Sequence, residues 1–518
     1  MMTKKIFFLI LILGFTLRFY QLGQIPNGLN WDENSNAYNA YSILKTKKDE
    51  YGNFLPLSNR SFDDYKPPLY MYLTIPAVWF FDLTPLAARV VSALFGFLTL
   101  PVIYLLTKKL FGKESVALIS MFFLAISPWH LQFSRIGFEA NLGLFFITAA
   151  IVALLYGLTQ TRWLVVSGFL IGFSAYSYHA ERILMPVLGF LVLIVFRDKV
   201  LEIPKRYLLL FFLSAVLIIL PLFIFTSGEA IGQRLRIASS ESVRENIEQS
   251  ISFIDQDSEN QFKFGNLIHN RRVLIAQTFL VNYLSHFDFN FLFVRGDDNP
   301  RHHIGGMGML YLFQLPLVVF GLYRLIKRHD RSSIAIMGWL LISPLAASPA
   351  SPAPHAVRAL TMVIAFQVIT AYSLTTILQI FPKLTKVFLI LIVGSFFVYL
   401  HNYYIHYPQE AASSWQYGYR EAVLESEKLK NHYAAVFVDK SLEQAYIFWL
   451  FTTGYDPARF QQEGSRSHFD KYYFETKPPT LPNELFASIA ENFPSGFSVI
   501  KTIYYPDGSE AVKIGYPR

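Results

Sequence analysis

Apolar runs long enough to cross a membrane recur along most of this 518-residue chain. They lie near residues 6–22, 86–107, 114–128, 141–158, 162–177, 183–196, 207–226, 307–325, 333–348, 356–380 and 386–402. A helix of about twenty apolar residues spans the roughly 30 Å hydrocarbon core of a bilayer. The composition, 53% hydrophobic and 16% charged residues, exceeds what one soluble core could bury. The chain is therefore predicted to be an all-α polytopic membrane protein with about eleven spans.

Basic residues flank these runs on one side. With a cytoplasmic N-terminus, the clusters that fall on the cytoplasmic side are Lys4-Lys5, Lys108-Lys109, Arg197-Lys199, Lys205-Arg206, Arg324-Lys327-Arg328 and Lys383-Lys386. The basic residues behind the formal charge of +8 are therefore mostly topology signals. We expect no nucleic-acid partner. No small-residue cleavage motif follows the first run, so we expect an uncleaved first span in the plasma membrane. The absence of cysteine excludes disulfides and thiolate metal sites.

This topology places two long loops, 23–85 and 227–306, and the C-terminal segment on the exported side. Loop 23–85 holds amphipathic stretches such as 36–44, which are expected to lie along the membrane interface as short helices. After residue 402 the pattern changes to a helix at 415–430 and a buried strand at 434–438. We therefore predict a transmembrane module at 1–402 and a small exported α/β domain at 403–518.

Acidic residues of the exported segments are candidates for acid–base chemistry. We prefer Asp32 as a base, with Glu33 orienting the acceptor or its neighbours. Glu139 lies between two spans and either pairs with Arg135 or serves as a second acid. Whether a divalent cation binds between Asp32 and Glu139 stays open. The pair at 49–50 is expected to be solvated.

Basic side chains of the same face are candidates for binding a phosphate. They are Lys66, Arg182, Arg301, His355 and Arg358. Arginine binds phosphate oxygens through two N–H groups, and lysine offers a point charge. Lys66 is preferred because Pro67 and Pro68 fix its position, whereas Arg182 and Arg301 could instead reach lipid headgroups.

Three further residues are expected to position a substrate: Arg135, Tyr70 and His179. His179 and the adjacent pair His302-His303 are not expected to build a zinc site, because adjacent histidines seldom bind one ion.

Four motifs together resemble those of the GT-C glycosyltransferases. They are Trp31-Asp32-Glu33, the segment Asp64-Tyr65-Lys66-Pro67-Pro68-Leu69-Tyr70, Ala88-Arg89-Val90, and Ser127-Pro128-Trp129-His130 leading to Glu139. Within that fold the chain is similar to the protein O-mannosyltransferases and the lipid A aminoarabinose transferases. The resemblance covers roughly residues 1–200, and the later spans resemble the family by architecture only.

The resemblance implies a polyprenyl-phosphate-linked sugar donor and inverting transfer at the exported face. It carries the catalytic base onto Asp32, the donor-phosphate contact onto Lys66 and the second acid onto Glu139. The relatives' second acid is in some cases Asp, so the longer Glu139 leaves its metal or acceptor role open. The sugar, hexosyl or pentosyl, and the acceptor, a protein, glycan or lipid, are not indicated.

Two alternatives remain open. A transporter or flippase of lipid-linked saccharides would use Asp32, Glu139 and Arg182 as coupling charges. The spans are expected to lack buried charge and the polar residues to crowd one face, which favours the enzyme. An oligosaccharyltransferase or polymerase on the same fold would differ only in its substrate, and a metal requirement would favour it.

Overall fold

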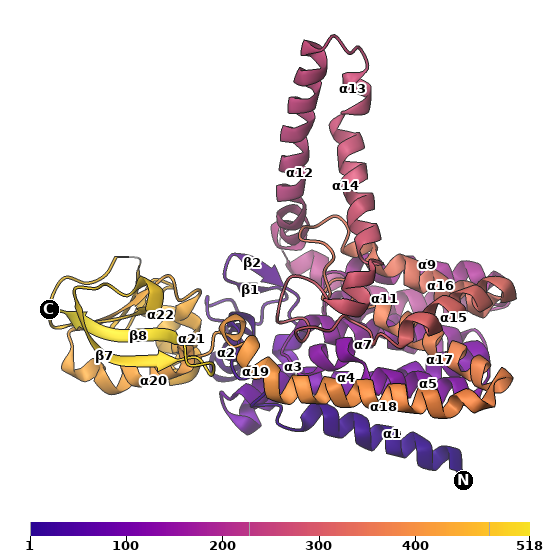
Figure 1. Cartoon of the computed structure of the whole chain (residues 1–518), viewed down its shortest axis with the longest axis horizontal. Helices are drawn as coiled ribbons and strands as arrows, with labels where there is room; N and C mark the ends of the chain where they lie inside the picture. The colour runs from indigo at the N-terminus through magenta and orange to yellow at the C-terminus, as the bar shows by residue number, and fades with distance from the viewer. Residues whose placement is uncertain (1, 227, 476) are drawn as a thin grey trace.

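The computed structural model describes residues 2–226, 228–475 and 477–518. Most of the chain up to residue 406 is helical (Figure 1). The first group of helices comprises α1 (Met2–Phe19), α4 (Pro85–Phe111), α5 (Glu114–Ile126), α6 (Pro128–Ser134), α7 (Glu139–Gly157), α8 (Arg162–Ala175), α9 (Glu181–Val195), α10 (Arg197–Leu201) and α11 (Lys205–Phe225). The second group comprises α15 (Gln314–Arg328), α16 (Arg331–Ile342), α17 (Met362–Ile380) and α18 (Thr385–His401). The two groups pack together, with α5 against α17.

Several of these helices suit a membrane. Among the described residues, α4, α7, α11, α17 and the segment Pro382–Glu410 are each long and apolar enough to cross a bilayer. The pair α5 and α6 makes a sixth candidate, bent by 58° where Pro128 interrupts the helical hydrogen bonds. The protein is thus a mostly helical, multi-pass membrane protein, while the count of eleven spans stays a prediction.

The helices differ in how deeply they are packed. In α7, 83% of the apolar window is buried, whereas in Pro382–Glu410 only 6% is. Since α7 packs against α4, α8 and α9, it forms the centre of the bundle. The first residue of α7 is Glu139, so this rigid helix positions one of the candidate acids.

Buried charge is present in the spans, so the prediction that they lack it is wrong. Arg18 near the end of α1 is fully buried. Its guanidinium donates to the carbonyls of Gly14 and Ala125 and contacts Nδ1 of His130 at 2.7 Å. These bonds satisfy the buried cation and tie α1 to the bend between α5 and α6.

The first loop forms α2 (Trp31–Thr46), the hairpin of β1 (Asn59–Ser61) and β2 (Asp64–Lys66), and α3 (Leu69–Phe81). A capping box starts α2: the Asn30 side chain accepts from the Glu33 N–H, and Glu33 accepts from the Asn30 N–H. The stretch 36–44 is helical as predicted. It is buried against α3 and against helices of the C-terminal segment, and its place at the membrane interface stays a prediction.

The acidic pair at 49–50 is buried, so the prediction of a solvated pair is also wrong. Asp49 is fully buried and Glu50 is 2% exposed. Asp49 accepts from the N–H groups of Tyr51 and Asn53, which forms a tight turn. Glu50 accepts from the Asn39 amide at 3.0 Å.

Glu50 gives the protein a pH-dependent stability. Burial raises the pKa of Glu50 from 4.5 to about 7. Between these values the folded state keeps a proton that the unfolded chain has lost, so stability falls as pH rises through this window, by about 3 kcal/mol. We expect Glu50→Gln to raise the unfolding temperature at pH 8 and to change it little at pH 4.5. Thermal unfolding in detergent tests this, with exposed Glu491→Gln as the control; equal shifts at both pH values would contradict it.

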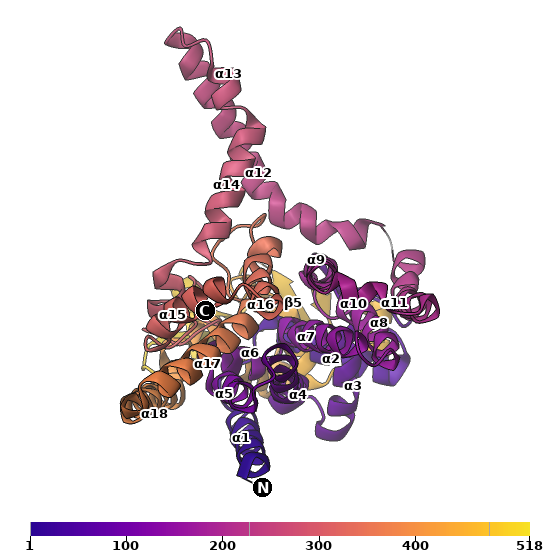
Figure 2. The same ribbon diagram turned by 90° about the vertical axis from the view of Figure 1, so that its right-hand side faces the viewer.

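The second long loop predicted from the sequence, 227–306, is largely helical among its described residues. Helices α12 (Gly228–Glu259), α13 (Gly265–Ile268) and α14 (Arg271–Ser285) form a hairpin that projects away from the bundle (Figures 1 and 2). The sequence predicted a long loop here and no helices. After the hairpin, the π-helical turn η1 (Asn290–Val294) leads into an irregular segment that returns to the bundle.

The C-terminal segment contains helices and strands, as predicted. It comprises α19 (Tyr407–Glu410), α20 (Tyr419–Leu429), β3 (Ala435–Asp439), α21 (Ala445–Thr453), α22 (Pro457–Glu463), β4 (His468–Phe469), β5 (Tyr472–Glu475), β6 (Glu484–Ile489), β7 (Phe497–Tyr504) and β8 (Glu510–Pro517). One sheet has the order β4-β5-β3-β6-β8-β7, with β3 parallel to both neighbours. It lies at the end of the bundle opposite the N-terminus, next to α2 (Figure 1). The boundary of a separate domain at 403 stays a prediction.

Candidate active site

A cavity of about 610 Å³ lies where the first loop, the start of α7 and two later loops meet. Its lining includes Trp31, Asp32, Asp64, Lys66, Glu139, His179, Arg301, His302, His355 and Arg358. Seven of these were site candidates from the sequence: Asp32, Lys66, Glu139, His179, Arg301, His355 and Arg358. The structure therefore brings most of the predicted site together, from segments more than 300 residues apart.

Asp32, Lys66 and Glu139 form the charged centre of this cavity. Asp32 lies in the first turn of α2, where the helix dipole favours an anion. Lys66 ends β2, and its ammonium is paired with the carboxylate of Asp32 and lies 3.9 Å from Oε1 of Glu139. The side chain of Lys66 is 7% exposed and that of Asp32 is 30% exposed. The carboxylate of Asp32 is thus accessible from the cavity, whereas the ammonium of Lys66 that pairs with it is almost fully buried.

This arrangement bears on the metal site left open between the two acids. Lys66 occupies the space between Asp32 and Glu139 and supplies the positive charge there. Glu139 also accepts from the Asn36 amide at 3.0 Å. We therefore assign no cation to this pair of carboxylates.

Glu33, predicted to orient either the acceptor or its neighbours, contacts its neighbours. It is fully buried and outside the cavity lining. Arg89 of α4 donates to both its oxygens, at 2.8 and 3.2 Å, and the Gly137 N–H donates at 2.8 Å. Glu33 thus ties α2 to α4 and to the segment before α7. It orients its neighbours, and its burial removes it from the acceptor.

Arg135 and Tyr70 were predicted to position a substrate, and the structure uses both inside the protein. Arg135 is 1% exposed and donates to the Tyr403 hydroxyl and the Leu17 carbonyl. The Tyr70 hydroxyl donates to the Ala88 carbonyl at 2.8 Å. Both side chains are buried and make these bonds inside the protein, so the prediction that they contact a substrate is wrong. The alternative pairing of Arg135 with Glu139 is replaced by the same bonds.

Arg182 and His179 lie side by side at the start of α9. Arg182 donates to the Ala175 carbonyl at 3.0 Å and contacts Nδ1 of His179 at 3.4 Å. His179 lines the cavity, and its Nε2 bonds the Tyr65 carbonyl next to Lys66. Arg182 thus supports His179 from outside the cavity lining, and the histidine fixes the strand that carries Lys66.

Arg301 and Arg358 approach the cavity from the two later loops. The guanidinium of Arg301 stacks over the ring of Trp31, 4.9 Å from its centroid, in a cation–π contact. Arg358 donates to the Ser351 carbonyl at 3.4 Å. Arg301 and Arg358 thus join Lys66 in the cavity lining, where cations could bind an anionic ligand.

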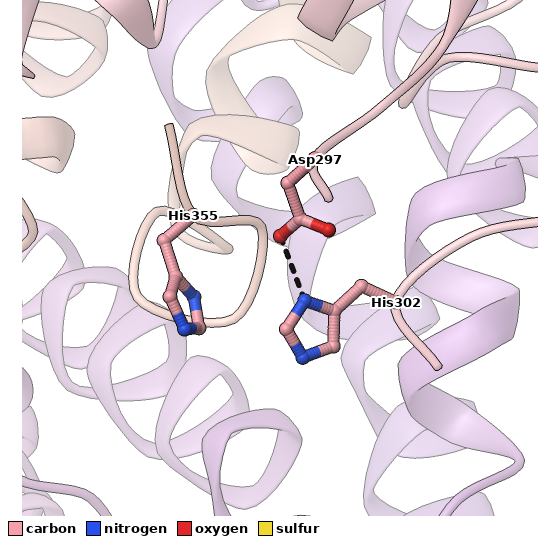
Figure 3. A group of neighbouring side chains, drawn as sticks. All are labelled: Asp297, His302 and His355. Atoms are coloured by element: carbon pink, nitrogen blue, oxygen red, sulfur yellow. Dashed lines mark hydrogen bonds and ion pairs between the residues drawn. The ribbon is translucent and has the colours of Figure 1, made fainter. Parts of the chain in front are cut away.

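A cluster of Asp297, His302 and His355 lies beside the cavity, which His302 and His355 line, and sequence reasoning missed this cluster (Figure 3). Nδ1 of His302 lies 2.7 Å from Oδ2 of Asp297. Burial raises the pKa of Asp297, but the His302 and Ala356 N–H groups outweigh it and hold the pKa at about 2. Burial lowers the pKa of His302, and burial with the charge of Arg358 lowers that of His355. Near neutral pH the carboxylate is therefore charged and both imidazoles are neutral.

Comparison with known proteins agrees with this architecture. Residues 65–225 match the family described as dolichyl-phosphate-mannose-protein mannosyltransferase. No curated protein matches the sequence. The structure of ArnT from Cupriavidus metallidurans in the apo state is similar over 99% of this chain and 98% of that one, at 12% identity and a TM-score of 0.57. The chain has the GT-C glycosyltransferase fold. The resemblance inferred from the sequence motifs is thus confirmed.

Two further structures show the same fold. ArnT from Cupriavidus metallidurans bound to undecaprenyl phosphate matches 98% of this chain and 97% of that one, at 13% identity and a TM-score of 0.55. The Archaeoglobus fulgidus oligosaccharyltransferase in complex with Zn and sulfate matches 98% of this chain and 72% of that one, at 15% identity and a TM-score of 0.52. The fold therefore occurs both in ArnT and in an oligosaccharyltransferase.

Proposed function

We propose that the protein transfers a sugar from a polyprenyl-phosphate-linked donor to an acceptor hydroxyl, with inversion of the anomeric centre. The observation that carries the proposal is the partly exposed carboxylate of Asp32, paired with Lys66 in a cavity that Arg301 and Arg358 also line. The family matched by residues 65–225 and the undecaprenyl phosphate bound by the similar ArnT support this donor class. The enzyme acts at the exported face of the plasma membrane, with its N-terminus in the cytoplasm.

In this mechanism Asp32 accepts the proton of the acceptor hydroxyl as its oxygen attacks the anomeric carbon. The bond from that carbon to the phosphate oxygen breaks, and the polyprenyl phosphate leaves with the electron pair. Lys66, Arg301 and Arg358 stabilise the negative charge on the leaving phosphate. Because attack and departure occur on opposite faces, the anomeric configuration inverts.

The acceptor reaches Asp32 from the C-terminal segment. A second cavity, of about 660 Å³, opens after β3 and is lined by Asp439, Lys440 and Glu443. It shares Trp31 and Gln444 with the first cavity. The carboxyl end of β3, between two parallel neighbours, is a preferred place for ligands in open sheets. We assign acceptor binding to residues 403–518 on this ground.

A second candidate function is oligosaccharyl transfer, favoured by the likeness to the Archaeoglobus fulgidus enzyme. Both functions place the donor phosphate in the same cavity and differ in the size of the transferred saccharide. A donor panel that contains both a monosaccharide and an oligosaccharide linked to polyprenyl phosphate or diphosphate separates them.

The test is transfer of labelled sugar from that panel by membranes that contain the wild type or Lys66→Ala at matched protein levels. We expect the wild type to transfer from at least one donor and Lys66→Ala to lose activity about a hundredfold, since a charge-assisted contact to the leaving group is removed. Exposed Lys45→Ala is the control and should keep wild-type activity. No transfer from any donor would favour the transporter, and a product with retained configuration would exclude direct displacement.

A further inference from the structure

The hairpin of α12, α13 and α14 extends across the direction of the spans. In Figure 1 the long helices α4 and α18 run along the bundle, and the hairpin points away from it sideways. Figure 2 looks along the bundle, so that α4 and α18 are foreshortened, and the hairpin again extends sideways. Since the long apolar helices cross the bilayer, a hairpin that lies across them runs along the membrane and not through it.

The base of the hairpin is bonded to the end of an apolar helix. The Tyr283 hydroxyl donates to the Leu341 carbonyl at 2.7 Å, and the Asn282 amide donates to the Ser348 carbonyl at 3.1 Å. Leu341 belongs to the last turn of α16, and Ser348 follows that helix. Figure 1 shows the hairpin in the half of the bundle nearer the C-terminal sheet. The hairpin therefore leaves the bundle within the membrane leaflet on that side.

Helix α14 has an exposed apolar face. Four side chains at helical spacing form it, each between 46% and 57% exposed: Val273, Leu280, Val281 and Leu284. Another side of α14 faces α12, where the Thr278 hydroxyl donates to the Asn246 side chain at 2.8 Å. The apolar face thus lies on a side of α14 that does not face its partner helix. A contiguous apolar surface of this kind marks an interaction site.

The apolar surface continues around the tip of the hairpin. Its exposed apolar side chains there are Phe262, Phe264, Leu267 and Ile268. Three exposed basic residues stand among and after them: Lys263, Arg271 and Arg272. Helices that lie in a membrane interface combine such residues, because the apolar groups enter the acyl region while the basic groups reach the lipid phosphates.

The two long helices of the hairpin differ in charge. From residue 244 to its end, α12 carries one basic residue and five acidic ones, which are Glu245, Glu248, Asp255, Asp257 and Glu259. Helix α14 carries two arginines and no acidic residue. In Figure 1 α14 lies on the side of the spans, and α12 lies on the side of the C-terminal sheet. The basic and apolar helix is therefore the one nearer the membrane.

We propose that α14 and the hairpin tip lie in the lipid bilayer, with the apolar face of α14 among the acyl chains of the leaflet nearer the C-terminal sheet. Arg271 and Arg272 contact lipid phosphates, and the acidic side of α12 faces water. The apolar face continues the lipid-facing surface of the bundle, because α11, the helix before the hairpin, has only 22% of its apolar window buried.

This position links the membrane surface to the candidate active site. Helix α12 contacts β2, which ends at Lys66. A hairpin held in the bilayer thus fixes the height of the Lys66 ammonium relative to the lipid phosphates, the level at which a polyprenyl phosphate also lies. The link to the donor rests on the proposed function, whereas the contact with lipid does not.

The test uses single cysteines, which can be labelled alone because the sequence contains none. Full-length Leu280→Cys and Leu284→Cys are labelled with an environment-sensitive fluorophore and reconstituted into vesicles of phosphatidylcholine and phosphatidylglycerol. One set of vesicles also contains a phospholipid with a doxyl quencher near the top of its acyl chain. We expect this lipid to remove about half or more of the fluorescence of both labels, since an interfacial helix inserts to that depth.

The matched control is Asp255→Cys, because Asp255 is exposed on the other long helix of the same hairpin. Its label should keep most of its fluorescence in the doxyl vesicles and be quenched by iodide from the water. Equal quenching of this label by the doxyl lipid would overturn the proposed orientation of the hairpin. Thermal unfolding of each labelled protein verifies its fold, and Val281→Cys replaces a variant that does not fold.

Two results at the α14 positions would overturn the proposal. Labels on Leu280→Cys and Leu284→Cys that only iodide quenches would mean that this face lies in water. Labels that neither quencher reaches would mean that a second copy of the chain covers the face. The fluorescence readout is independent of sugar transfer, so its failure is distinguishable from a failure of the proposed function.

Discussion

Asp32→Asn should lower the kcat of sugar transfer about a hundredfold or more, the scale of a lost general base. Asparagine has nearly the same size as aspartate, but its amide cannot accept the proton of the acceptor hydroxyl. The side chain of Asp32 is 30% exposed at the cavity, so the substitution removes the base without opening the core. Initial rates at saturating donor, at matched protein levels, measure the effect.

The control for this experiment is Asp64→Asn. Asp64 also lines the cavity, and its carboxylate accepts from the N–H of Tyr65. It should retain activity near that of the wild type, which separates loss of the base from loss of negative charge. Full activity in Asp32→Asn would move the base to Glu139, the other acid beside Lys66. The pH profile adds a second readout, because loss of the base should remove the acidic limb of kcat.

The sequence predicted the centre of the site because topology places its parts together. Asp32 and Lys66 lie in the loop after the first apolar run and Glu139 follows the third, and alternating spans are expected to bring those segments to one side of the membrane. Residues that lie on one side of the membrane and next to the ends of the spans are confined to a small region. The structure accordingly has all three in one cavity.

The same reasoning could not tell which way a side chain faces. Glu33 is adjacent to Asp32, yet it turns inward because Arg89 and the N-terminus of α2 bind it. Arg135 is four residues before Glu139, but its guanidinium instead donates to the Tyr403 hydroxyl, 268 residues away. Local spacing predicts the residues that can meet on one helix, whereas tertiary partners decide which of them are buried.

The Asp297, His302 and His355 cluster escaped sequence reasoning for a related reason. Its members lie in two irregular loops, where no periodicity fixes direction. A carboxylate and two histidines lie within seven residues of one loop, 297–303, but the third member of the cluster, His355, is more than 50 positions further on. Only the packing of the two loops shows which histidine faces the carboxylate.

The ion pair of Arg89 and Glu33 should give the largest effect on stability. Both side chains are fully buried. Arg89→Met leaves the Glu33 carboxylate without its cation, which costs about 3–5 kcal/mol in comparable buried pairs. Arg89 also donates to the Pro26 carbonyl at 2.8 Å, so the loop before α2 loses a contact as well. Thermal unfolding in detergent should show a lower midpoint, while the remaining folded protein keeps its transfer activity.

The double variant Glu33→Gln with Arg89→Met decides between a structural and a catalytic role for Glu33. Removing both charges leaves no uncompensated ion, so part of the lost stability should return. Glutamine also keeps the bond from the Gly137 N–H. If Glu33 only holds α2 against α4, the double variant transfers sugar at close to the wild-type rate, because Asp32 keeps its place at the start of α2. A Glu33→Gln protein that melts like the wild type but has lost transfer would instead return Glu33 to the reaction.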